Sequence, residues 1–307
     1  MSFKSIVCGV DFSRHSARAL RYAAALARVK GAKLTVVFAV DPLLSTAAAT
    51  AYNSRAIASS ARTELHRFVR SALRKQRTPG VGIIVEIGTP AATVLSVAGR
   101  LGADVVVVGS HGLTGLRKVF FGSTTEAILR RSPVPVLAVP RTRSLPKHWP
   151  AGLVVAPVDM ADSVAAEAAT ASAIAEACGG SLAVVHAIPA MHLPFWERAN
   201  KRVIDRTRIK LAKDWLNTNL ERSGAHAEGR VIIGEMAEAA AAFAARRGAS
   251  MLVFTLPASG PIGRFLDGAV AYRLVHHARC PVLVVRLRAG RSRRRKRTSR
   301  LSLHRVA

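Results

Sequence analysis

The chain has 307 residues, enough for about two domains, and half of them are hydrophobic although only 5% are aromatic. Lys and Arg number 46 against 18 Asp and Glu, and the formal net charge of +28 favours polyanionic partners such as nucleic acid, anionic lipid or phosphate-rich ligands. Cys8, Cys178 and Cys280 lie in separate apolar runs, which favours buried thiols in a reducing compartment over a disulfide framework or a metal cluster. No export signal and no apolar window of about 18 residues is evident, so the sequence predicts a cytoplasmic protein without a transmembrane segment.

The first half alternates short apolar runs with helical patterns. Helices are expected from about Ala17 to Gly31, around Leu65 to Leu73, from Pro90 to near Gly102, and from Gly122 to Arg131. The strands expected between them are Ser5–Val10, Lys33–Val40, Val81–Ile87, Val105–Val108 and Val134–Val139. Near-continuous apolar strands separated by helices predict an α/β domain with a parallel sheet and helices on both faces.

The same pattern then begins again. Leu153–Asp159 mirrors Ile6–Asp11, and Cys280–Val285 mirrors Val134–Val139. From the third strand onward the offset is constant, since Pro135 and Pro281, like Gly122 and Gly268, are 146 residues apart. This internal duplication predicts two tandem doubly wound domains over residues 1–140 and 151–287. The edge strands around Val136 and Val284 are expected to pair, either with each other or across chains.

The stretch from Val105 to Thr124 is the strongest candidate for a ligand site. Four consecutive valines predict a buried strand, and a glycine-rich loop follows it directly. Glycines let backbone N–H groups approach an anion closely, and a helix N-terminus adds unpaired donors and a partial positive charge. A phosphate site is therefore expected, with a loose surface turn as the alternative. The residues of this loop and helix start are Gly109, Gly112, Gly115, Arg117, Lys118, Gly122, Ser123 and Thr124.

Asp11 ends the first strand of the same domain. In doubly wound sheets ligands bind beyond the carboxyl ends of the strands, where the strand order reverses. If the first and fourth strands are neighbours, Asp11 faces the loop from Gly109 to Gly122 and suits a ribose hydroxyl or a metal-bound phosphate. The alternative is a plain helix cap or turn residue.

These residues resemble the universal stress protein family. The spacing Gly109-x2-Gly112-x9-Gly122-Ser123, in its GSHG context, matches the family's nucleotide-binding signature, and Asp11 and Val40-Asp41 also fit. The resemblance covers residues from about 3 to 287 and points to a tandem two-domain member. It implies a five-stranded sheet of order 3-2-1-4-5 in each domain, and ATP bound without a strong catalytic apparatus.

The resemblance also implies a role for each matching position. Asp11 would contact the ribose and the backbone near Val40 the adenine. The phosphates would then be held along the loop and the helix start by Gly109, Gly112, Gly122, Ser123 and the following Thr124. Lys118 or Arg117 is expected to neutralise phosphate charge, an inference from charge and not part of the signature. Mg²⁺ could accompany the ATP, but no catalytic residue and no metal site of the protein itself is predicted.

The second copy departs from this pattern. Asp159 persists, but the constant offset places Thr255 at Gly109, Ala258 at Gly112 and Ala269 at Ser123, and only Gly268 remains. The copy is expected to keep the strand and the helix start but to lose close backbone approach and the serine hydroxyl. One competent site in the first half is therefore predicted, although Gly260 and Gly263 could build a different loop.

The leading hypothesis is a cytoplasmic ATP-binding stress-response protein that senses or regulates. One alternative is a protein that binds nucleic acid or an anionic membrane through the basic tail, residues 288–307, and the helix face from Arg67 to Arg77. The tail is expected to be disordered because like charges repel and cannot bury a core. Another alternative is a slow ATPase using Lys118, Ser123 and a metal ion, although no general base is evident. No GxxxxGK[ST], HExxH or GxSxG motif occurs.

Overall fold

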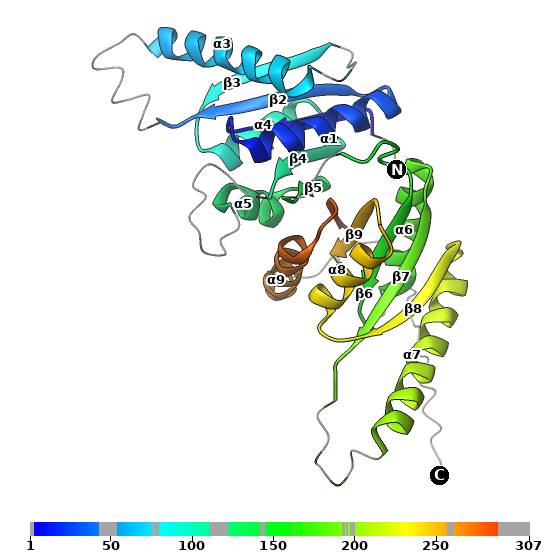
Figure 1. Ribbon diagram of the computed structural model, residues 1–307. Coiled ribbons are helices and arrows are strands. Elements are labelled where there is room, and N and C mark those ends of the chain that lie inside the picture. The colour runs from blue at the N-terminus through cyan, green and yellow to red at the C-terminus, as the bar shows by residue number, and fades with distance from the viewer. Residues whose placement is uncertain are drawn as a thin grey trace, which may run out of the picture.

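A computed structural model gives the fold of the chain (Figure 1). It describes residues 3–42, 54–74, 76, 80–110, 122–141, 145–161, 163–191, 194, 196, 200–256 and 261–287, with only the helical backbone over 54–57 and 261–268. Residues 111–121 of the glycine-rich loop and the basic tail lie outside the described residues. Among the described helices, none is both long and apolar enough to cross a membrane.

The expected alternation of strands and helices is present in both halves. The first half contains β1 Ser5–Gly9, α1 Arg14–Lys30, β2 Lys33–Val40, α3 Ser54–Leu73, β3 Val81–Ile87, α4 Pro90–Arg100, β4 Val105–Gly109, α5 Ser123–Arg131 and β5 Val136–Val139. The second half contains β6 Leu153–Val158, α6 Val164–Cys178, β7 Ser181–Ile188, α7 Lys201–Ser223, β8 Ala227–Ile233, α8 Met236–Arg246, β9 Met251–Leu256, α9 Pro261–His277 and β10 Val282–Arg286.

The ends of α1 follow directly from the sequence. Ser13 caps its N-terminus, because the Ser13 hydroxyl accepts a hydrogen bond of 3.0 Å from the backbone N–H of Ser16. Gly31 ends the helix in the left-handed region, at φ 60°, where a side chain would be strained. The helix therefore starts just past the carboxyl end of β1, at the edge where a ligand is expected.

The two halves form one sheet. The strand order is β3-β2-β1-β4-β5-β10-β9-β6-β7-β8, so each half has the predicted order 3-2-1-4-5 with parallel strands. The halves meet where β5 and β10 pair antiparallel, with Val136 opposite Val284. The predicted pairing of these edges thus occurs within the chain, and it makes the sheet as a whole mixed. Strand β5 begins two residues later than expected, at Val136. Pro135 has no N–H to donate, but its carbonyl accepts a 2.9 Å hydrogen bond from the N–H of Val106 in β4.

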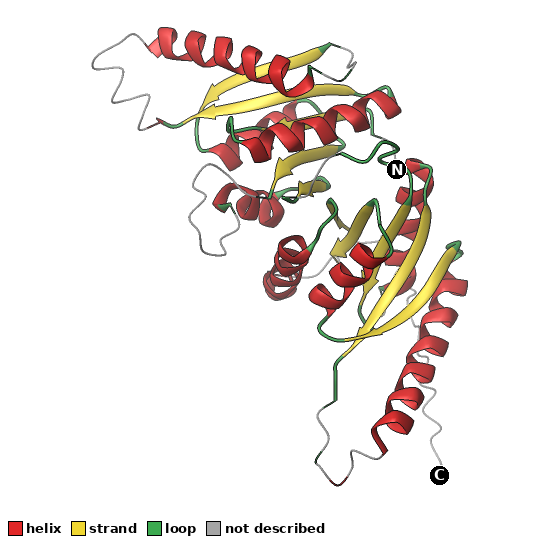
Figure 2. Cartoon of the chain, in the orientation of Figure 1, coloured by secondary structure: helices red, strands yellow, loops and turns green. Residues whose placement is uncertain are grey.

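Helices cover both faces of the sheet, as predicted (Figure 2). One core layer lies under α1, α3, α6 and α7, and its side chains include Leu20, Leu65 and Leu216. The other lies under α4, α5, α8 and α9 and includes Ile128 and Leu274. Because strand residues alternate between the two layers, central strands such as β4 and β5 are buried along their whole length, whereas the outer strand β8 contains Glu228 and Arg230.

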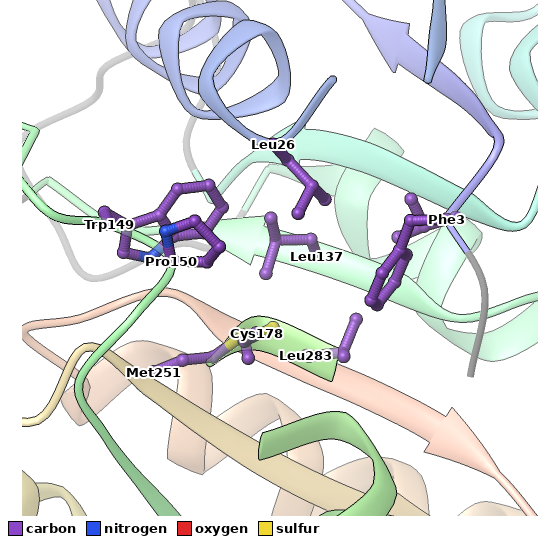
Figure 3. Close-up of a pocket in the computed structure, with 9 residues that line it drawn as sticks. Phe3, Leu26, Leu137, Trp149, Pro150, Cys178, Met251 and Leu283 are labelled. Carbon is purple, nitrogen blue, oxygen red and sulfur yellow. The ribbon is translucent and has the colours of Figure 1, made fainter. Parts of the chain in front are cut away.

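Side chains from both halves also pack at the junction between them. The indole N–H of Trp149, in the linker, donates to the Ser250 carbonyl at 3.2 Å, and its ring lies edge-on to Tyr22 of α1. Beside it lies a small apolar cavity of about 10 Å³ that Leu137 of β5 and Leu283 of β10 help to line (Figure 3). That volume holds about one water molecule, so the junction is a packed core and not a ligand pocket.

Candidate functional site

The candidate site lies at the carboxyl ends of β1, β2, β4 and β5. Strands β1 and β4 are neighbours, with Cys8 opposite Val107, although β2 and β3 separate them in the chain. The order of the strands therefore reverses between β1 and β4, which is the switch point where ligands bind in doubly wound sheets. The condition for Asp11 to face the loop after Gly109 is thus met.

Asp11 is held at the start of α1. Its carboxylate accepts a 3.0 Å hydrogen bond from the Ser13 N–H, and its own N–H donates to the Ser16 hydroxyl at 3.3 Å. The half-buried Asp11 is therefore a turn residue, as the alternative interpretation had it. The same bonds fix its carboxylate at the switch point, so this structural role does not exclude a contact with ribose.

Phe12 turns the chain between Asp11 and the helix. Its φ of 63° lies in the left-handed region, which costs a non-glycine residue about 1 kcal/mol or more. Its ring packs on Phe38 of β2 at 4.4 Å between centroids and edge-on to Phe68 of α3 at 5.5 Å. These aromatic contacts hold the strained turn in place, and with it Asp11.

The expected adenine contact lies at the end of β2. Val40 is buried, and its carbonyl accepts a 2.9 Å hydrogen bond from the N–H of Gly88, which follows β3. A carbonyl oxygen has two lone pairs, so this bond leaves one for a ligand amino group. The backbone here is fixed by β3 and forms a rigid wall at the same edge as Asp11.

The two ends of the glycine-rich loop are joined. The Gly122 N–H donates to the Ser110 carbonyl at 3.3 Å, and the Thr125 hydroxyl donates to the Gly109 carbonyl at 2.7 Å. Ser110 in turn donates its N–H to the Val139 carbonyl of β5 at 2.9 Å. Ser110 and Thr125 are both buried, so the loop begins and ends at a fixed point of the core. Gly112 and Lys118, like Gly115 and Arg117, fall within 111–121, outside the described residues.

Helix α5 presents its N-terminus at this point. Gly122 is the N-cap and provides no side-chain acceptor for the first-turn N–H groups, and Ser123, the first helical residue, is exposed. Thr124 follows half-buried. Glu126 in the same turn pairs with Arg130 at 2.8 Å, which offsets its negative charge. The uncapped N–H groups and the partial positive charge of the helix are suited to an anion.

Sequence reasoning missed a group of basic side chains near Asp11. His15 and Arg18 lie on the first turns of α1, and Arg141 follows β5 two residues after Val139. Burial, and then the charges of Arg141 and Arg18, lower the pKa of His15, while Asp11 acts in the opposite direction. Basic side chains placed close together repel one another when they are charged. A bound anion would relieve this repulsion, so such a group is expected where an anion binds. Only the sheet order brings Arg141 close to α1, so no sequence spacing could have revealed this group.

Thr125 was also missed, although the sequence held a signal. The residue 146 positions further on is Ala271, which is equally buried but has no hydroxyl. The loop anchor of the first half therefore has no counterpart in the second. A comparison of the two copies at buried positions would have identified it.

The second half builds this edge differently. Strand β9 continues to Leu256, and α9 begins at Pro261, so Gly268 and Ala269 lie inside a helix. The expectation that the second copy keeps the helix start at Gly268 is therefore wrong. Proline is favoured in the first turn, and Pro261 starts the helix well before that glycine. The N–H groups of Gly268 and Ala269 belong to the helix interior and cannot form an anion site.

Other contacts at the second edge also differ. Asp159 is exposed, and its carboxylate accepts from the N–H of the next residue at 2.7 Å. A ring nitrogen of the buried His186 lies 3.0 Å from the Val158 carbonyl, where the first half has Phe38. Within the described parts of the chain, no cluster of His, Cys, Asp and Glu could hold a metal ion.

A doubly wound half with the strand order 3-2-1-4-5, repeated once in the same chain, defines the class of tandem Rossmann-like α/β proteins. The model of the universal stress protein family matches residues 2–140 and 153–286. The chain belongs to this family and contains two of its domains.

Individual proteins agree with this assignment. A universal stress protein of Thermus aquaticus is 32% identical over 138 residues, which cover 45% of this chain and 98% of that protein. One from Methanocaldococcus jannaschii is 25% identical over 158 residues, with 46% and 98% covered. The crystal structure of a universal stress protein from Archaeoglobus fulgidus shares the fold over 93% of this chain and 97% of its own, with a TM-score of 0.60 at 16% identity.

Proposed function

We propose that the first half binds one ATP molecule and that the protein acts as a nucleotide-dependent sensor or regulator. The observation that carries this proposal is the anchored loop, because Thr125 and Ser110 join its ends beside an uncapped helix N-terminus. The second half, with the same fold, has neither the anchor nor that helix start. The fold does not require these features, so a ligand is the best reason for them.

The ATP would lie across the switch point. Its terminal phosphates would meet the first-turn N–H groups of α5 and the Ser123 hydroxyl, and its ribose would face Asp11. Arg18 and Arg141, which are not part of the signature, would supply positive charge that offsets the charge of the phosphates. Mg²⁺ usually keeps several waters and binds mainly to nucleotide phosphates, so it would need few protein ligands here.

We infer sensing in preference to turnover because the resemblance to the family implies ATP bound without a strong catalytic apparatus. A slow ATPase using Lys118 stays a prediction, since Lys118 lies outside the described residues. Binding to a polyanion through α3 stays a prediction too. Arg70 and Arg74 are exposed there, but Arg67 pairs with Glu64 at 2.6 Å, as on an ordinary solvated helix face.

Isothermal titration with ATP tests the proposal. The wild type is expected to bind about one ATP per chain, and Gly112→Val is expected to abolish binding because its side chain blocks close backbone approach. The matched control is Ala258→Val, which introduces the same residue at the corresponding position of the second half and should bind as the wild type does. Absence of binding by the wild type, or equal binding by Gly112→Val, would refute the proposed site. A stoichiometry near two would refute the asymmetry between the halves.

A further inference from the structure

Helix α7 presents a surface that the nucleotide site does not explain. The helix lies along β8 at the outer edge of the sheet, and its first turns extend past the ends of the strands (Figure 1). Its buried residues are Ala212, Leu216 and Leu220, and none of the residues before Ala212 is buried. The first half of the helix therefore has no fully buried side chain, although it contains several large apolar residues.

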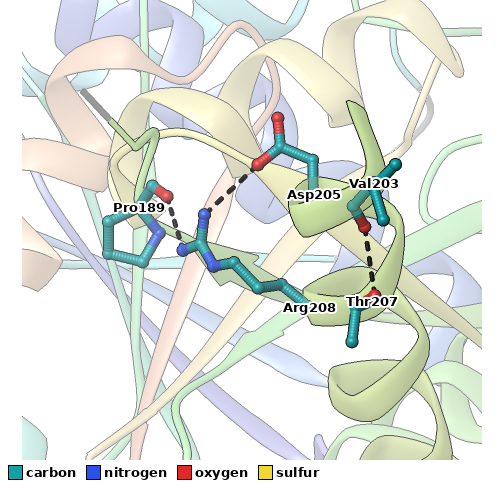
Figure 4. Close-up of polar contacts among 5 residues, drawn as sticks. All are labelled: Pro189, Val203, Asp205, Thr207 and Arg208. Carbon is teal, nitrogen blue, oxygen red and sulfur yellow. Dashed lines mark hydrogen bonds and ion pairs between the residues drawn. The ribbon is translucent and has the colours of Figure 1, made fainter. Parts of the chain in front are cut away.

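The exposed apolar side chains of these turns form a stripe on the outer face, whereas Ile204 and Ile209 are half-buried. Val203 is 63% exposed and Leu211 is 65% exposed, and Thr207 lies between them at helical spacing. The Thr207 hydroxyl donates to the Val203 carbonyl at 3.0 Å, so it is satisfied within the helix and leaves its methyl group on the surface (Figure 4). Trp196, just before the helix, is 68% exposed.

A basic stripe runs beside the apolar one. Arg202, Arg206, Lys210 and Lys213 follow one another at intervals of four, four and three residues, and all are exposed. None of the four forms an ion pair with another described residue. The exposed acid nearest to these residues on the helix is Asp214, which follows Leu211 by three residues and Lys210 by four and so ends both stripes. The surface therefore combines an apolar strip with positive charge that no ion pair among the described residues neutralises.

The helix is fixed to the body of the protein by Arg208. Its guanidinium donates to the carbonyl of Pro189, which follows β7, at 2.9 Å, and it also lies 3.4 Å from the Asp205 carboxylate (Figure 4). Arg208 thereby neutralises Asp205 and turns away from the basic stripe. The contacts of Arg208 therefore hold the apolar stripe and the basic stripe in a defined orientation before any partner binds.

We propose that this face of α7 docks on an anionic phospholipid bilayer, with the helix lying in the plane of the membrane surface. Val203, Leu211 and Trp196 would enter the boundary between headgroups and acyl chains, and the basic stripe would meet the lipid phosphates. Lys and Arg on the polar side, with aromatic and aliphatic residues on the other, are what interfacial helices use. The helix would lie on the membrane and not cross it.

The combination of stripes favours lipid over the other partners of a basic surface. A nucleic acid backbone would satisfy Arg202 and Lys210 but gives no apolar phase for Val203 and Leu211. A second copy of this chain would cover the apolar stripe, but a symmetric pairing would bring two basic stripes together. Only a surface that is both anionic and apolar complements the whole face.

Vesicle binding tests this proposal with Trp196 as a local reporter. Trp149 is buried and Trp215 is partly buried, so a change in the environment of an exposed indole reports Trp196. Vesicles of phosphatidylcholine with phosphatidylglycerol should shift the fluorescence of the full chain to the blue and sediment with it, whereas pure phosphatidylcholine should do neither. Trp196→Phe should still sediment but should lose the shift.

Charge-neutral variants separate this face from the basic tail. The double change Val203→Gln with Leu211→Gln should weaken vesicle binding about ten-fold, since two apolar side chains lose their burial while every charge remains. The matched control, Val29→Gln with Ile87→Gln, changes two other half-exposed apolar residues and should bind as the wild type does. Sedimentation without a Trp196 shift, or binding unaffected by the α7 changes, would overturn the proposal. So would a Trp196 response to DNA alone, or a blue shift that grows with protein concentration in the absence of lipid.

Discussion

The hydrogen bond from Thr125 to Gly109 gives the most direct test of the loop anchor. Thr125→Val keeps the shape of the side chain but removes the hydroxyl that donates to the Gly109 carbonyl at 2.7 Å. Thr125 is only 4% exposed, so water cannot easily replace the lost donor. A buried acceptor left unsatisfied costs about 1–3 kcal/mol, and urea unfolding of Thr125→Val should show a loss in this range.

The same change should weaken ATP binding. Without the Thr125 bond, the loop ends depend on the longer contact from the Gly122 N–H to the Ser110 carbonyl, at 3.3 Å. If the conformation with joined loop ends is destabilised by about 1.4 kcal/mol, part of the binding free energy of ATP is used to form it. The apparent affinity for ATP then falls about ten-fold. Isothermal titration measures this, and Thr125→Ser, which keeps the hydroxyl, should stay close to the wild type. A Thr125→Val protein that is destabilised but binds ATP normally would show that the bond serves the fold alone.

Two further predictions concern titrating groups. The pKa of His15 is lowered from its ordinary value of 6.5 in the folded protein, so the unfolded state binds more protons and stability is lost as the pH falls through about 6.5. Phosphates favour the imidazolium, so ATP binding near pH 6 should take up a proton, seen as a dependence of the titration heat on buffer ionisation enthalpy. His15→Gln should abolish this uptake, and an unchanged uptake would exclude His15 as its source. Burial raises the pKa of Cys8 and Cys178 and raises the pKa of Cys280 to about 12. Cys8 and Cys178 are buried and Cys280 is half-buried, so a thiol reagent at pH 8 should modify Cys8 and Cys178 quickly only in denaturant. Rapid labelling of Cys8 or Cys178 in the native protein would contradict the burial of these two thiols.

Several features of the fold could be predicted from the sequence because they depend on local patterns. The apolar runs Lys33–Val40 and Val81–Ile87 match β2 and β3 residue for residue, and Gly31 ends α1 as expected. A run of apolar residues specifies a buried strand, and a glycine is the residue that best tolerates a left-handed helix end. The constant offset of 146 residues likewise showed that two copies of one fold are present, because a duplication is recorded in the chain itself.

The candidate site was predictable only in part. Asp11, Gly109 and Gly122 lie at the predicted edge, because a signature in the chain specifies them and the sheet order brings their strands together. The sequence did not reveal that α9 starts at Pro261, since a glycine inside a helix and one before it look alike in a sequence. The structure shows that α9 begins at Pro261, so Gly268 falls inside the helix and does not mark its start.

The sequence by itself determined the elements of each half, their duplication and the glycine signature, because each of these depends on residues close together in the chain. The tertiary structure alone decided how the elements meet. It placed Arg141 beside α1, joined Thr125 to Gly109 across the loop, and paired β5 with β10 within one chain. These contacts join residues far apart in sequence, and their partners are selected by the order of strands and the burial of side chains, which no local pattern records.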